Sequence, residues 1–414
     1  MKEMEQLFKS RQKGIYKMRI LSVTAQKPHS TGSGVYLTEL VKGFHRLGHE
    51  QAVVAGIYKE DIVCFPGGTD FYPVYFKSDE LPFSIAGMSD EMPYESTIYS
   101  QMTEKMTKNF MERFSKVLAQ TMEEFKPDII LCHHLYLLTA LVREKYPDQK
   151  VVGLCHGSDL RQIKKTILER NYIKENIRML NEIFVLHDEQ ASDVAAIFKA
   201  ENEKIKVIGT GFNQEIFRNM SIERKTDHIN LIFAGKLSKA KGVFSLIRCL
   251  EYLPFETDRL TLKLAGGYGN EKEYAAICET ARTSRYSVEF LGQLNQEALA
   301  REMNKSDIFI LPSFYEGLPL VIIEALACGA KVVSTDLPGV KVWMDRSLPY
   351  HGIVFVKPPK MERIDEPAQG EEPAFERRLA EGIELSLGQD NKNLDMSGLS
   401  WDGICRKMLS LFTL

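Results

Sequence analysis

The sequence predicts an α/β protein with two doubly wound parallel sheets, each in a domain of its own. Three observations support this class. The chain has 414 residues, more than a single hydrophobic core usually holds. Short apolar runs alternate with segments of helical length, as expected for parallel strands covered by helices. A polar, charged stretch at Arg218–His228 separates two such series and places the domain boundary near residue 220.

The first series opens with a strand at Arg19–Ala25, a glycine-rich turn at Gly32–Gly34 and an amphipathic helix at Val35–Gly48. Doubly wound domains begin in this order. Asp61–Glu95 has no clear period and is rich in Pro, Gly, Phe and Tyr, so it is expected to form loops and a hairpin insertion. The remaining predicted elements are strand His49–Ala55, helix Ser100–Phe125 and strands Pro127–Cys132, Lys150–Cys155 and Glu182–Leu186.

The second series contains further predicted strands at Ile229–Ala234, Leu260–Ala265, Val288–Phe290, Ile308–Leu311 and Lys331–Ser334. Met361–Glu376 is charged and contains proline, which indicates an exposed loop. Leu394–Leu414 carries apolar residues near helical spacing and predicts a terminal helix. The expected domains are therefore 18–220 and 221–393, with a basic arm at 1–17 and a final helix at 394–414.

Composition narrows the classes of function. Hydrophobic residues make up 44% and charged residues 26% of the chain, which is typical of globular proteins. A net charge of -3 gives no reason to expect a nucleic-acid partner. The seven cysteines show no paired metal spacing and fit reduced thiols in the cytoplasm. No apolar run reaches the length of a membrane span, and Met1–Lys17 is too charged for a secretory signal.

The most informative segment is Tyr315–Val340, which reads YEGLPLVIIEALACGAKVVSTDLPGV. Because proline is favoured in the first turn of a helix, Pro319 predicts a helix that begins near Leu318. The backbone N–H groups of Leu320 and Val321 then lie at the positive end of the helix dipole. A phosphate can bind at such a position.

Two carboxylates accompany this helix. Glu324 follows Glu316 by eight residues, so the two side chains can reach different parts of one extended ligand. Carboxylates accept hydrogen bonds from hydroxyl groups, and a nucleotide sugar offers vicinal hydroxyls on either side of its diphosphate. An isolated pair would indicate only a solvated helix face. The β-branched strand at Lys331–Thr335 completes a strand-loop-helix-strand unit and favours the ligand-binding interpretation.

The whole segment resembles the signature of the retaining glycosyltransferases of family 4, two glutamates separated by seven residues. The resemblance implies the GT-B fold, in which two Rossmann-like doubly wound domains face a central cleft and the last helix crosses back to the first domain. It implies a hexosyltransferase whose donor is a nucleotide-diphosphate sugar, with a UDP-sugar expected, and neither a metal nor another cofactor. Attack would occur on the face of the sugar that the leaving phosphate occupies, with its assistance.

The resemblance also implies roles for single residues. Glu316 is expected to hold hydroxyls of the transferred sugar, and Glu324 those of the ribose. Residues near Phe290–Leu294 are expected to contact the base largely through their backbone. The donor-binding set is completed by Gly32, Gly34, Leu291, Gly317, Leu318, Leu320 and Val321.

A pair of lysines follows the first strand of the second series. Phe233–Gly242, FAGKLSKAKG, places Lys236 just after a strand and Lys241 five residues further on, each beside a glycine. Two cations at such a turn suit a diphosphate, although a solvated lysine-rich turn has the same composition. In the family the matching positions are usually Arg and Lys. Lys236 therefore keeps the charge but lacks the planar guanidinium.

The glycines Gly32 and Gly34 lie between the first predicted strand and helix, where glycine allows backbone to approach a ligand closely. The full dinucleotide pattern is missing because position 37 is Leu, so a Rossmann redox enzyme is not supported. The family resemblance places this loop beside the donor phosphates and the acceptor.

Histidines follow two of the predicted strands. Leu154–Asp159, LCHGSD, places His156 and Asp159 at the carboxyl edge of the sheet, where open α/β sheets bind ligands. In related enzymes the matching histidine lies against the donor sugar, so His156 is assigned to sugar contact and Asp159 to the acceptor side. His133 and His134 follow another strand and could line the same site. Metal binding would need a third ligand at recognisable spacing.

A basic segment follows the His156 loop and consists of Lys164, Lys165, Arg170, Lys174 and Arg178. If it faces the acceptor, it favours a phosphorylated acceptor or one held in an anionic membrane, with the protein at the inner face of that membrane. Otherwise it is a solvated surface. The acceptor class stays open between a glycan, a lipid-linked molecule and a small molecule.

Two other functions fit the same motifs. A nucleotide-sugar epimerase of the same fold would need no second substrate, and product analysis with the donor alone separates it from a transferase. A non-catalytic subunit that binds a sugar nucleotide for a partner is suggested by the departure at Lys236 and by the arm at 1–17. Hydrolysis or transfer by the isolated chain would exclude that function.

Overall fold

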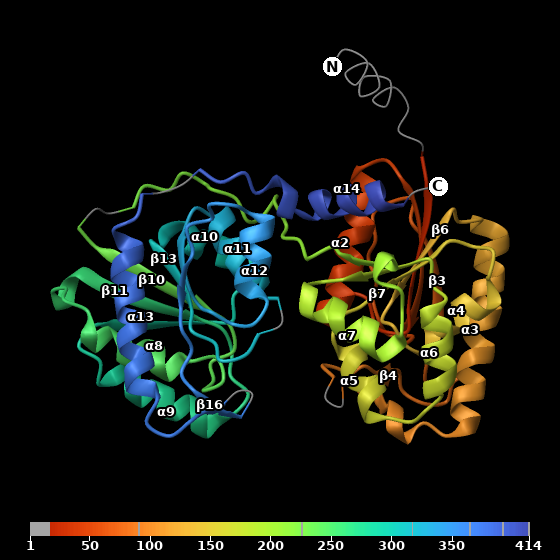
Figure 1. The fold of residues 1–414 in the computed structure, drawn as a ribbon, viewed down its shortest axis with the longest axis horizontal. Coiled ribbons are helices and arrows are strands. Elements are labelled where there is room, and N and C mark those ends of the chain that lie inside the picture. Colours follow the sequence, from red (N-terminus) through yellow and green to blue (C-terminus); the bar gives the residue numbers. More distant parts are fainter. Residues whose placement is uncertain are drawn as a thin grey trace, which may run out of the picture. The chain divides into compact units, whose positions relative to one another are not determined.

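The computed structural model describes residues 17–89, 92–224, 227–316, 318–363, 366–390 and 393–412. The chain divides into two compact units, Met1–Gly209 with Cys405–Leu414, and Thr210–Ile404. Figure 1 shows a central sheet with helices on both faces in each unit. Apart from Lys17, the expected arm at 1–17 lies outside the described residues.

The division between the units falls before residue 220, at Gly209 and Thr210. The segment that follows packs with the second unit, because Phe212 and Phe217 are buried in its core. Helix α14 (Trp401–Leu411) starts in the second unit, and its residues from Cys405 onward belong to the first.

The first unit contains a seven-stranded sheet in the order β3-β2-β1-β6-β7-β8-β9, and all its strand pairs are parallel. The strands are β1 (Arg19–Thr24), β2 (Glu50–Ile57), β3 (Asp70–Tyr75), β6 (Ile129–His133), β7 (Val151–Leu154), β8 (Glu182–Val185) and β9 (Ile205–Val207). The helices are α2 (Gly32–Arg46), α3 (Glu104–Phe125), α4 (Leu137–Lys145), α5 (Ser158–Lys165), α6 (Arg170–Arg178) and α7 (Asp188–Phe198).

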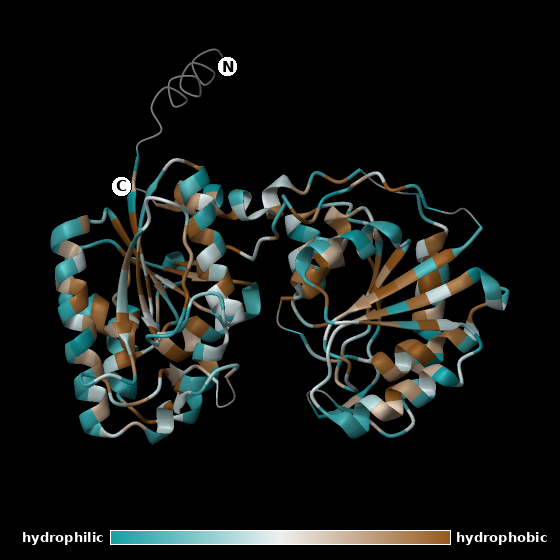
Figure 2. Ribbon diagram, turned by 180° about the vertical axis from the view of Figure 1, so that it is seen from behind, coloured by the Kyte–Doolittle hydropathy of each residue, from teal (hydrophilic) through white to brown (hydrophobic). Residues whose placement is uncertain are grey.

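The core of the first unit forms because its strands are apolar on both faces. Every residue of β6 is buried, and α3 packs Phe110 and Phe114 beside the sheet with their rings 4.6 Å apart. Burial of one such side chain contributes about 2 kcal/mol. Figure 2 shows hydrophobic strands inside each unit and hydrophilic residues on the outer faces of the helices.

The end of the chain completes this core. The Phe412 ring, 4% exposed, lies 5.9 Å from the Phe184 ring and 6.3 Å from the Phe44 ring. The thiol of Cys405 approaches the carbonyl oxygen of Leu40 at 3.7 Å. The last helix therefore packs on residues of α2 and β8.

The second unit contains a six-stranded sheet in the order β12-β11-β10-β13-β14-β15, again with parallel pairs. The strands are β10 (Ile229–Ala234), β11 (Leu260–Ala265), β12 (Ser287–Gly292), β13 (Ile308–Leu311), β14 (Lys331–Thr335) and β15 (Val354–Val356). The helices are α8 (Val243–Cys249), α9 (Glu271–Arg282), α10 (Gln296–Lys305), α11 (Leu320–Ala327), α12 (Val340–Ser347) and α13 (Glu372–Leu387).

The two doubly wound parallel sheets confirm the predicted fold class. In each sheet the strand order reverses once, between β1 and β6 in the first unit and between β10 and β13 in the second. Ligands of open α/β sheets bind outside the carboxyl ends of the strands at this switch point. The loops that follow these four strands are therefore where a site is expected.

Two local predictions for the first unit were wrong. Gly32–Gly34 is not a turn before the helix but its first turn, because the Thr31 side chain caps α2 by accepting from the Gly34 N–H at 3.1 Å. The region 61–95 is not a hairpin insertion, since β3 joins the main sheet beside β2 and the short strands β4 (Ala86–Gly87) and β5 (Thr97–Ile98) pair in parallel. Pro73 is tolerated because β3 is an edge strand.

The loop predicted at Met361–Glu376 was also wrong in part. It contains two short antiparallel strands, β16 (Met361–Arg363) and β17 (Glu366–Pro367), and the start of α13. The helix forms because Phe375, Leu379 and Ile383 recur every four residues and are all fully buried. The strand β15 was not predicted at all.

Candidate active site

The first site feature is the lysine loop, Gly235–Gly242, which follows β10 at the switch point of the second sheet. It is held to the loop after β13, because the Phe314 N–H donates to the carbonyl oxygen of Ala240 at 3.0 Å. Gly242 has a φ of +69°, and a β-carbon there would lie 2.0 Å from the carbonyl oxygen of Pro312. Only glycine fits at this close approach.

An ion pair joins these two loops. The Lys241 Nζ lies 2.6 Å from Glu316 Oε1, and the Ser313 hydroxyl donates to the same oxygen at 2.7 Å. The side chains are 29% exposed for Lys241 and 15% for Glu316, so both can still be reached from solvent. The structure therefore brings together two residues predicted from the sequence and places a cation and a carboxylate side by side.

Lys236 lies in the same loop but outside that ion pair. Its side chain is exposed and runs close to Gly269, where a β-carbon would lie 2.7 Å from the Lys236 Nζ. Lys236 thus adds a second positive charge to this loop. Its ammonium is a compact charge on a flexible side chain, so it can adjust its position to a bound anion.

The helix α11 begins at Leu320, with Pro319 as its N-cap, two residues later than the start near Leu318 predicted from the sequence. Leu320 and Val321 are its first two residues, and α-helices leave such N–H groups without intrahelical partners. Leu318 is partly buried just before the cap. Gly317, expected among the donor-binding residues, lies outside the described residues.

Glu324 lies on the second turn of α11. Burial raises the pKa of its carboxyl to about 7, because removal from water disfavours the charged form. Hydrogen bonds donated by the hydroxyl groups of a ligand would stabilise the charged form of this buried carboxyl. The hydrogen-bonding role of Glu324 remains a prediction.

A cavity of about 450 Å³ opens at the carboxyl ends of β10, β11 and β12. This volume is in the range that small-molecule sites occupy. Its walls come largely from glycines and small or apolar side chains, namely Ala234, Gly235, Ala265, Gly266, Gly267, Gln293, Leu294, Leu299 and Val321. Leu291, predicted to bind the donor, is a partly buried residue of β12 outside this lining, whereas Gln293 and Leu294 contribute to it.

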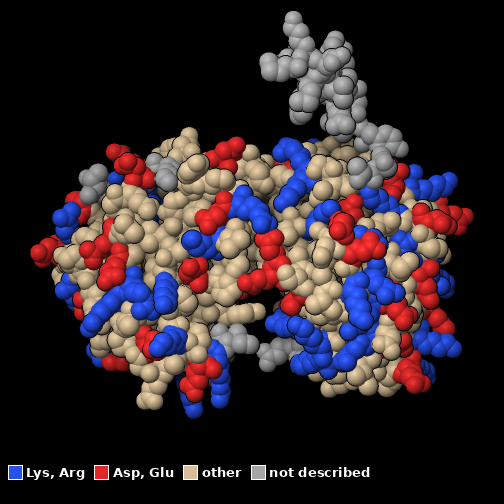
Figure 3. All heavy atoms as spheres, in the orientation of Figure 1, with Lys and Arg blue, Asp and Glu red and all other residues tan. Residues whose placement is uncertain are grey.

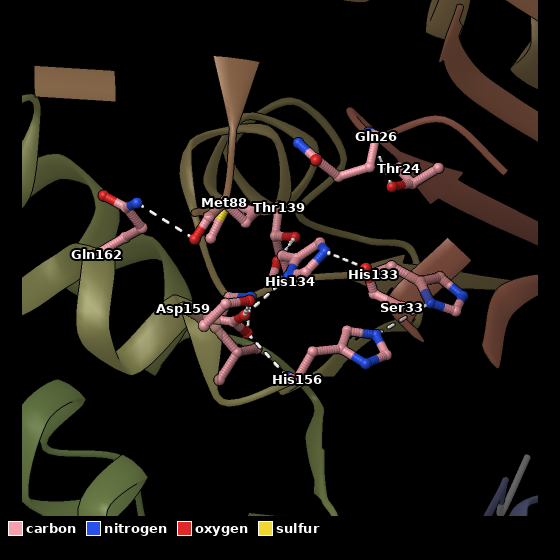
Figure 4. A network of polar contacts seen from close by, with 12 residues as sticks. Thr24, Gln26, Ser33, Met88, His133, His134, Thr139, His156, Asp159 and Gln162 are labelled. Atoms are coloured by element: carbon pink, nitrogen blue, oxygen red, sulfur yellow. Dashed lines mark hydrogen bonds and ion pairs between the residues drawn. The ribbon is translucent and has the colours of Figure 1, made fainter. Parts of the chain in front are cut away.

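The second site feature is the histidine cluster, formed by His133, His134, His156 and Asp159 at the carboxyl ends of β6 and β7. The His134 ring lies between two partners (Figure 4). Its Nδ1 is 2.7 Å from Asp159 Oδ1, and its Nε2 is 3.0 Å from the hydroxyl of Ser33. The cluster therefore reaches the first turn of α2, which follows β1.

Asp159 is fully buried, with 0% exposure. Its Oδ2 accepts from the backbone N–H groups of Leu135 at 2.8 Å and His156 at 3.2 Å. Burial alone opposes ionisation, but the pairing with His134 and the hydrogen bond from the Leu135 N–H outweigh it and hold the pKa of Asp159 below its usual value. Asp159 was expected on the acceptor side, but its side chain is fully buried. Its hydrogen bonds with the Leu135 and His156 N–H groups hold together the loops that follow β6 and β7.

His156 is half-buried beside two rings. It stacks on His133 with ring centres 5.4 Å apart and an interplanar angle of 11°, and it forms a T-shaped pair with the Tyr36 ring with ring centres 5.3 Å apart. Burial lowers the pKa of His156 to about 3, and it lowers that of His133 well below the usual value. Both imidazoles are therefore neutral near pH 7 and act as hydrogen-bonding rather than charged groups.

The two glycines of α2 have different surroundings. A β-carbon at Gly34 would lie 2.5 Å from the carbonyl oxygen of Lys27, so this glycine is required by the packing of the protein itself. Nothing lies within 4 Å of the corresponding point at Gly32. Of the two glycines expected beside a ligand, only Gly32 faces open space.

Residues that the sequence interpretation left unassigned also take part. Ser33 and Ser313 each hydrogen-bond a residue of the site, and Tyr36 supports His156. Ser313 lies two residues after a predicted strand, where polar side chains gather in open α/β sheets, and this position was the signal that could have found it. Ser33 lies further from its strand, between the two glycines that the sequence singles out, and this neighbourhood was its signal.

Two other kinds of feature are absent from the described ranges. No group of three or more His, Cys, Asp or Glu side chains there is arranged to hold a metal ion. Among the same residues, no helix combines the length and the apolar character needed to cross a bilayer.

Two doubly wound parallel-sheet units in one chain are the architecture of two-domain transferases with the GT-B fold. Two family models match consecutive parts of the chain: Glycosyltransferase Family 4 over residues 30–215 and Glycosyl transferases group 1 over residues 214–366. The chain belongs to the group 1 glycosyltransferases of family 4.

Single relatives match with lower coverage. An uncharacterised glycosyltransferase of Methanocaldococcus jannaschii is 31% identical over 36% of this chain and 40% of its own length. D-inositol 3-phosphate glycosyltransferase of Kribbella flavida is 30% identical over 51% of this chain and 56% of its own. The chain thus matches about half the length of these relatives. The solved structure of HepE from Anabaena in complex with UDP has a TM-score of 0.58 and 12% identity, covers 95% of this chain and 99% of its own, and shows the shared fold.

Proposed function

We propose that this chain is a retaining hexosyltransferase that moves a sugar from a UDP-sugar to a hydroxyl group of an acceptor without a metal ion. One observation carries the proposal: the Lys241–Glu316 pair, 2.6 Å long, lies beside the start of α11 at a sheet switch point. Such a site offers a cation for a diphosphate and a carboxylate for sugar hydroxyls within one ligand length.

The donor occupies the second unit in this proposal. The cavity at the ends of β10 to β12 receives the base and ribose, and Glu324 accepts hydrogen bonds from the ribose hydroxyls. Lys236 and Lys241 neutralise the diphosphate, together with the N–H groups of Leu320 and Val321. The complex of HepE with UDP supports uracil as the base, since that protein has the same fold.

The departing diphosphate determines the chemistry. It leaves with the electron pair of the glycosidic bond, and the two lysines and the start of α11 stabilise the charge that develops. Glu316 is held by Lys241 and Ser313, so it is better placed to hold sugar hydroxyls than to attack the anomeric carbon. The acceptor oxygen therefore attacks on the face that the phosphate leaves, and the configuration is retained.

The acceptor binds the first unit in this proposal. His156, neutral and half-buried, contacts a sugar hydroxyl, and Asp159 positions the loops around it. The name of the Kribbella relative supports a phosphorylated small molecule as one acceptor class. A glycan or a lipid-linked molecule fits the same contacts.

A basic surface on the first unit favours an acceptor presented at an anionic membrane. Blue side chains cover α5 and α6 in Figure 3, and these helices and the loop between them carry Arg161, Lys164, Lys165, Arg170, Lys174 and Arg178. Two apolar side chains stand out beside them, Ile167 at 84% and Met179 at 62% exposure. Basic residues attract anionic lipids, and exposed apolar side chains can enter the interface.

The proposal is tested first by a panel of UDP-, GDP- and ADP-sugars in thermal unfolding. A ligand that binds the folded state raises the apparent Tm, and a UDP-sugar is expected to give the largest rise. Incubation with that donor and candidate acceptors should then yield a product with the donor's anomeric configuration by NMR. An epimerised donor, or binding without any hydrolysis or transfer, would contradict the proposal.

A further inference from the structure

Ser33, His134 and Asp159 form a continuous hydrogen-bonded line within the first unit (Figure 4). The distances are 3.0 Å from the Ser33 hydroxyl to His134 Nε2 and 2.7 Å from His134 Nδ1 to Asp159 Oδ1. Exposure falls along the line, since Ser33 is half-buried, His134 is 5% exposed and Asp159 is 0% exposed. Only its serine end can be reached by a ligand.

The chemistry of the three groups fixes the direction of the protons. An ionised carboxylate can only accept, so the His134 proton lies on Nδ1 and points at Asp159. In a neutral imidazole the other nitrogen then carries a lone pair, which accepts the Ser33 proton. The Thr31 hydroxyl, 3.0 Å from that of Ser33, already accepts from the Gly34 N–H and is free to donate to the Ser33 oxygen.

The backbone of His134 has a strained conformation, and hydrogen bonds from neighbouring residues hold it in place. Its φ is +72°, a left-handed conformation that residues with a β-carbon adopt only at a cost of about 1–3 kcal/mol. The His134 N–H donates to the carbonyl oxygen of Leu154 at 2.9 Å, and the Thr139 hydroxyl donates to the His134 carbonyl oxygen. These contacts, together with Asp159, hold the ring in line with Ser33.

We propose that Ser33 is a catalytic residue that takes the proton of the acceptor hydroxyl and passes its own proton to His134, with His134 and Asp159 as positioning residues. This inference rests on the proposed transfer of a sugar. Aligned serine, histidine and buried aspartate side chains are a recurrent means of drawing a proton from a hydroxyl group.

The proposed step is balanced. The acceptor oxygen forms a bond to the anomeric carbon as the bond from that carbon to the diphosphate oxygen breaks, and the diphosphate leaves with the electron pair. The acceptor proton moves to the Ser33 oxygen while the Ser33 proton moves to His134 Nε2. The imidazolium that results is stabilised by the Asp159 carboxylate until it returns the proton to the leaving phosphate or to water.

Donor hydrolysis tests this role with water in place of the unidentified acceptor. The full chain is incubated with UDP-glucose, UDP-galactose and UDP-N-acetylglucosamine, and sugar release is followed for the wild type, Ser33→Ala and Ser30→Ala. Ser30 is the matched control, an exposed serine of the same segment whose hydroxyl points to the Pro28 carbonyl oxygen at 3.4 Å. General-base assistance is worth about 10²- to 10⁴-fold in rate.

We expect S33A to lower kcat by at least about 10²-fold, with the KM for the donor and the Kd for UDP unchanged. The control S30A is expected to match the wild type. A merely structural serine would change KM, the Kd and the Tm together. A kcat for S33A close to that of the wild type would overturn the role of Ser33.

The direction of the protons is tested separately by NMR of the full chain with ¹⁵N-labelled histidine. The proton of His134 is expected on Nδ1, the Nε2 resonance is expected to shift in S33A, and Asp159→Asn is expected to move the proton to Nε2. A wild-type His134 protonated on Nε2 would refute the proposal, because Ser33 could not then donate to it. If the wild type turns over none of the three donors, the proposed function fails for them, while the NMR result still decides the proton direction.

Discussion

The lysine loop and the histidine cluster occupy equivalent switch points in two similar sheets, yet they are built in opposite ways. The ion pair of the lysine loop is partly exposed, with Lys241 at 29% and Glu316 at 15%. The central groups of the histidine cluster are buried, with His134 at 5% and Asp159 at 0%. One site offers mobile charge, and the other offers neutral hydrogen-bonding groups in fixed orientations.

This difference indicates that one fold can serve two kinds of ligand chemistry. A diphosphate is compact and highly charged, and it binds well to cations that can still adjust. A hydroxyl group is neutral and must be selected by direction, which requires preorganised partners. The unit whose site carries charge is therefore the proposed donor side, and the unit whose site is neutral is the proposed acceptor side.

The largest expected effect is on the charged site. Lys241→Ala should lower kcat for donor turnover by about 10²- to 10³-fold, because it removes a cation from the developing diphosphate charge. Glu316→Gln should cause a loss of similar size. Steady-state assays should compare both with Lys239→Ala, which removes an exposed lysine of the same loop. Equal losses in K241A and K239A would show that general surface charge, and not the ion pair, matters.

The next effect concerns packing at the neutral site. Gly34→Ala should lower the free energy of unfolding by about 2 kcal/mol, because its β-carbon would meet the Lys27 carbonyl oxygen at 2.5 Å. Gly32→Ala, which meets nothing within 4 Å, should stay within about 0.5 kcal/mol of the wild type. Urea unfolding measures both. Similar stabilities for the two variants would remove the distinction between these glycines.

The smallest effect is a pH dependence confined to the charged side. With the pKa of Glu324 at about 7, UDP-glucose should bind roughly tenfold more weakly at about pH 6 than at about pH 8, because ribose hydroxyls donate to the ionised form. Calorimetry should find this dependence abolished in Glu324→Gln. UDP-glucose is preferred to UDP, whose terminal phosphate titrates near pH 6 itself.

The folding stability of the protein without ligand depends on pH in the opposite direction to ligand affinity. The pKa of Glu324 is raised from 4.5 in the unfolded chain to about 7 in the fold, so its contribution to stability is fully present below about pH 4.5 and is lost as the pH rises toward 7. E324Q should lack this dependence as well. Ligand affinity that weakens as the pH rises from 6 to 8 would exclude the proposed role of Glu324.

The fold was predictable where a single physical signal dominated. The bounds of β10, β11 and β13 agree with the sequence to the residue, because apolar residues dominate each of these buried parallel strands. The strand β3 was missed because Pro73 argues against a strand, and β15 because it has only three residues. The helix α13 was missed because its charged start concealed the apolar spacing of its second half.

The site was predictable to the level of loops but not of contacts. The sequence places Lys241 and Glu316 after two strands, and their ion pair follows from the sheet order. The burial of Asp159 and its bond to His134 depend on how α5 packs, which no local pattern encodes. The different surroundings of Gly32 and Gly34 likewise depend on the path of residues 27–29.

The placement of Phe412 against Phe44 and Phe184 has a consequence for synthesis on the ribosome. The chain emerges from its N-terminus, so residues of the first unit leave the ribosome long before the aromatic ring that covers them. Until Phe412 has left the ribosome, that patch stays open to chaperones or to incorrect contacts. Maturation of the first unit is thereby delayed until the whole second unit has been made.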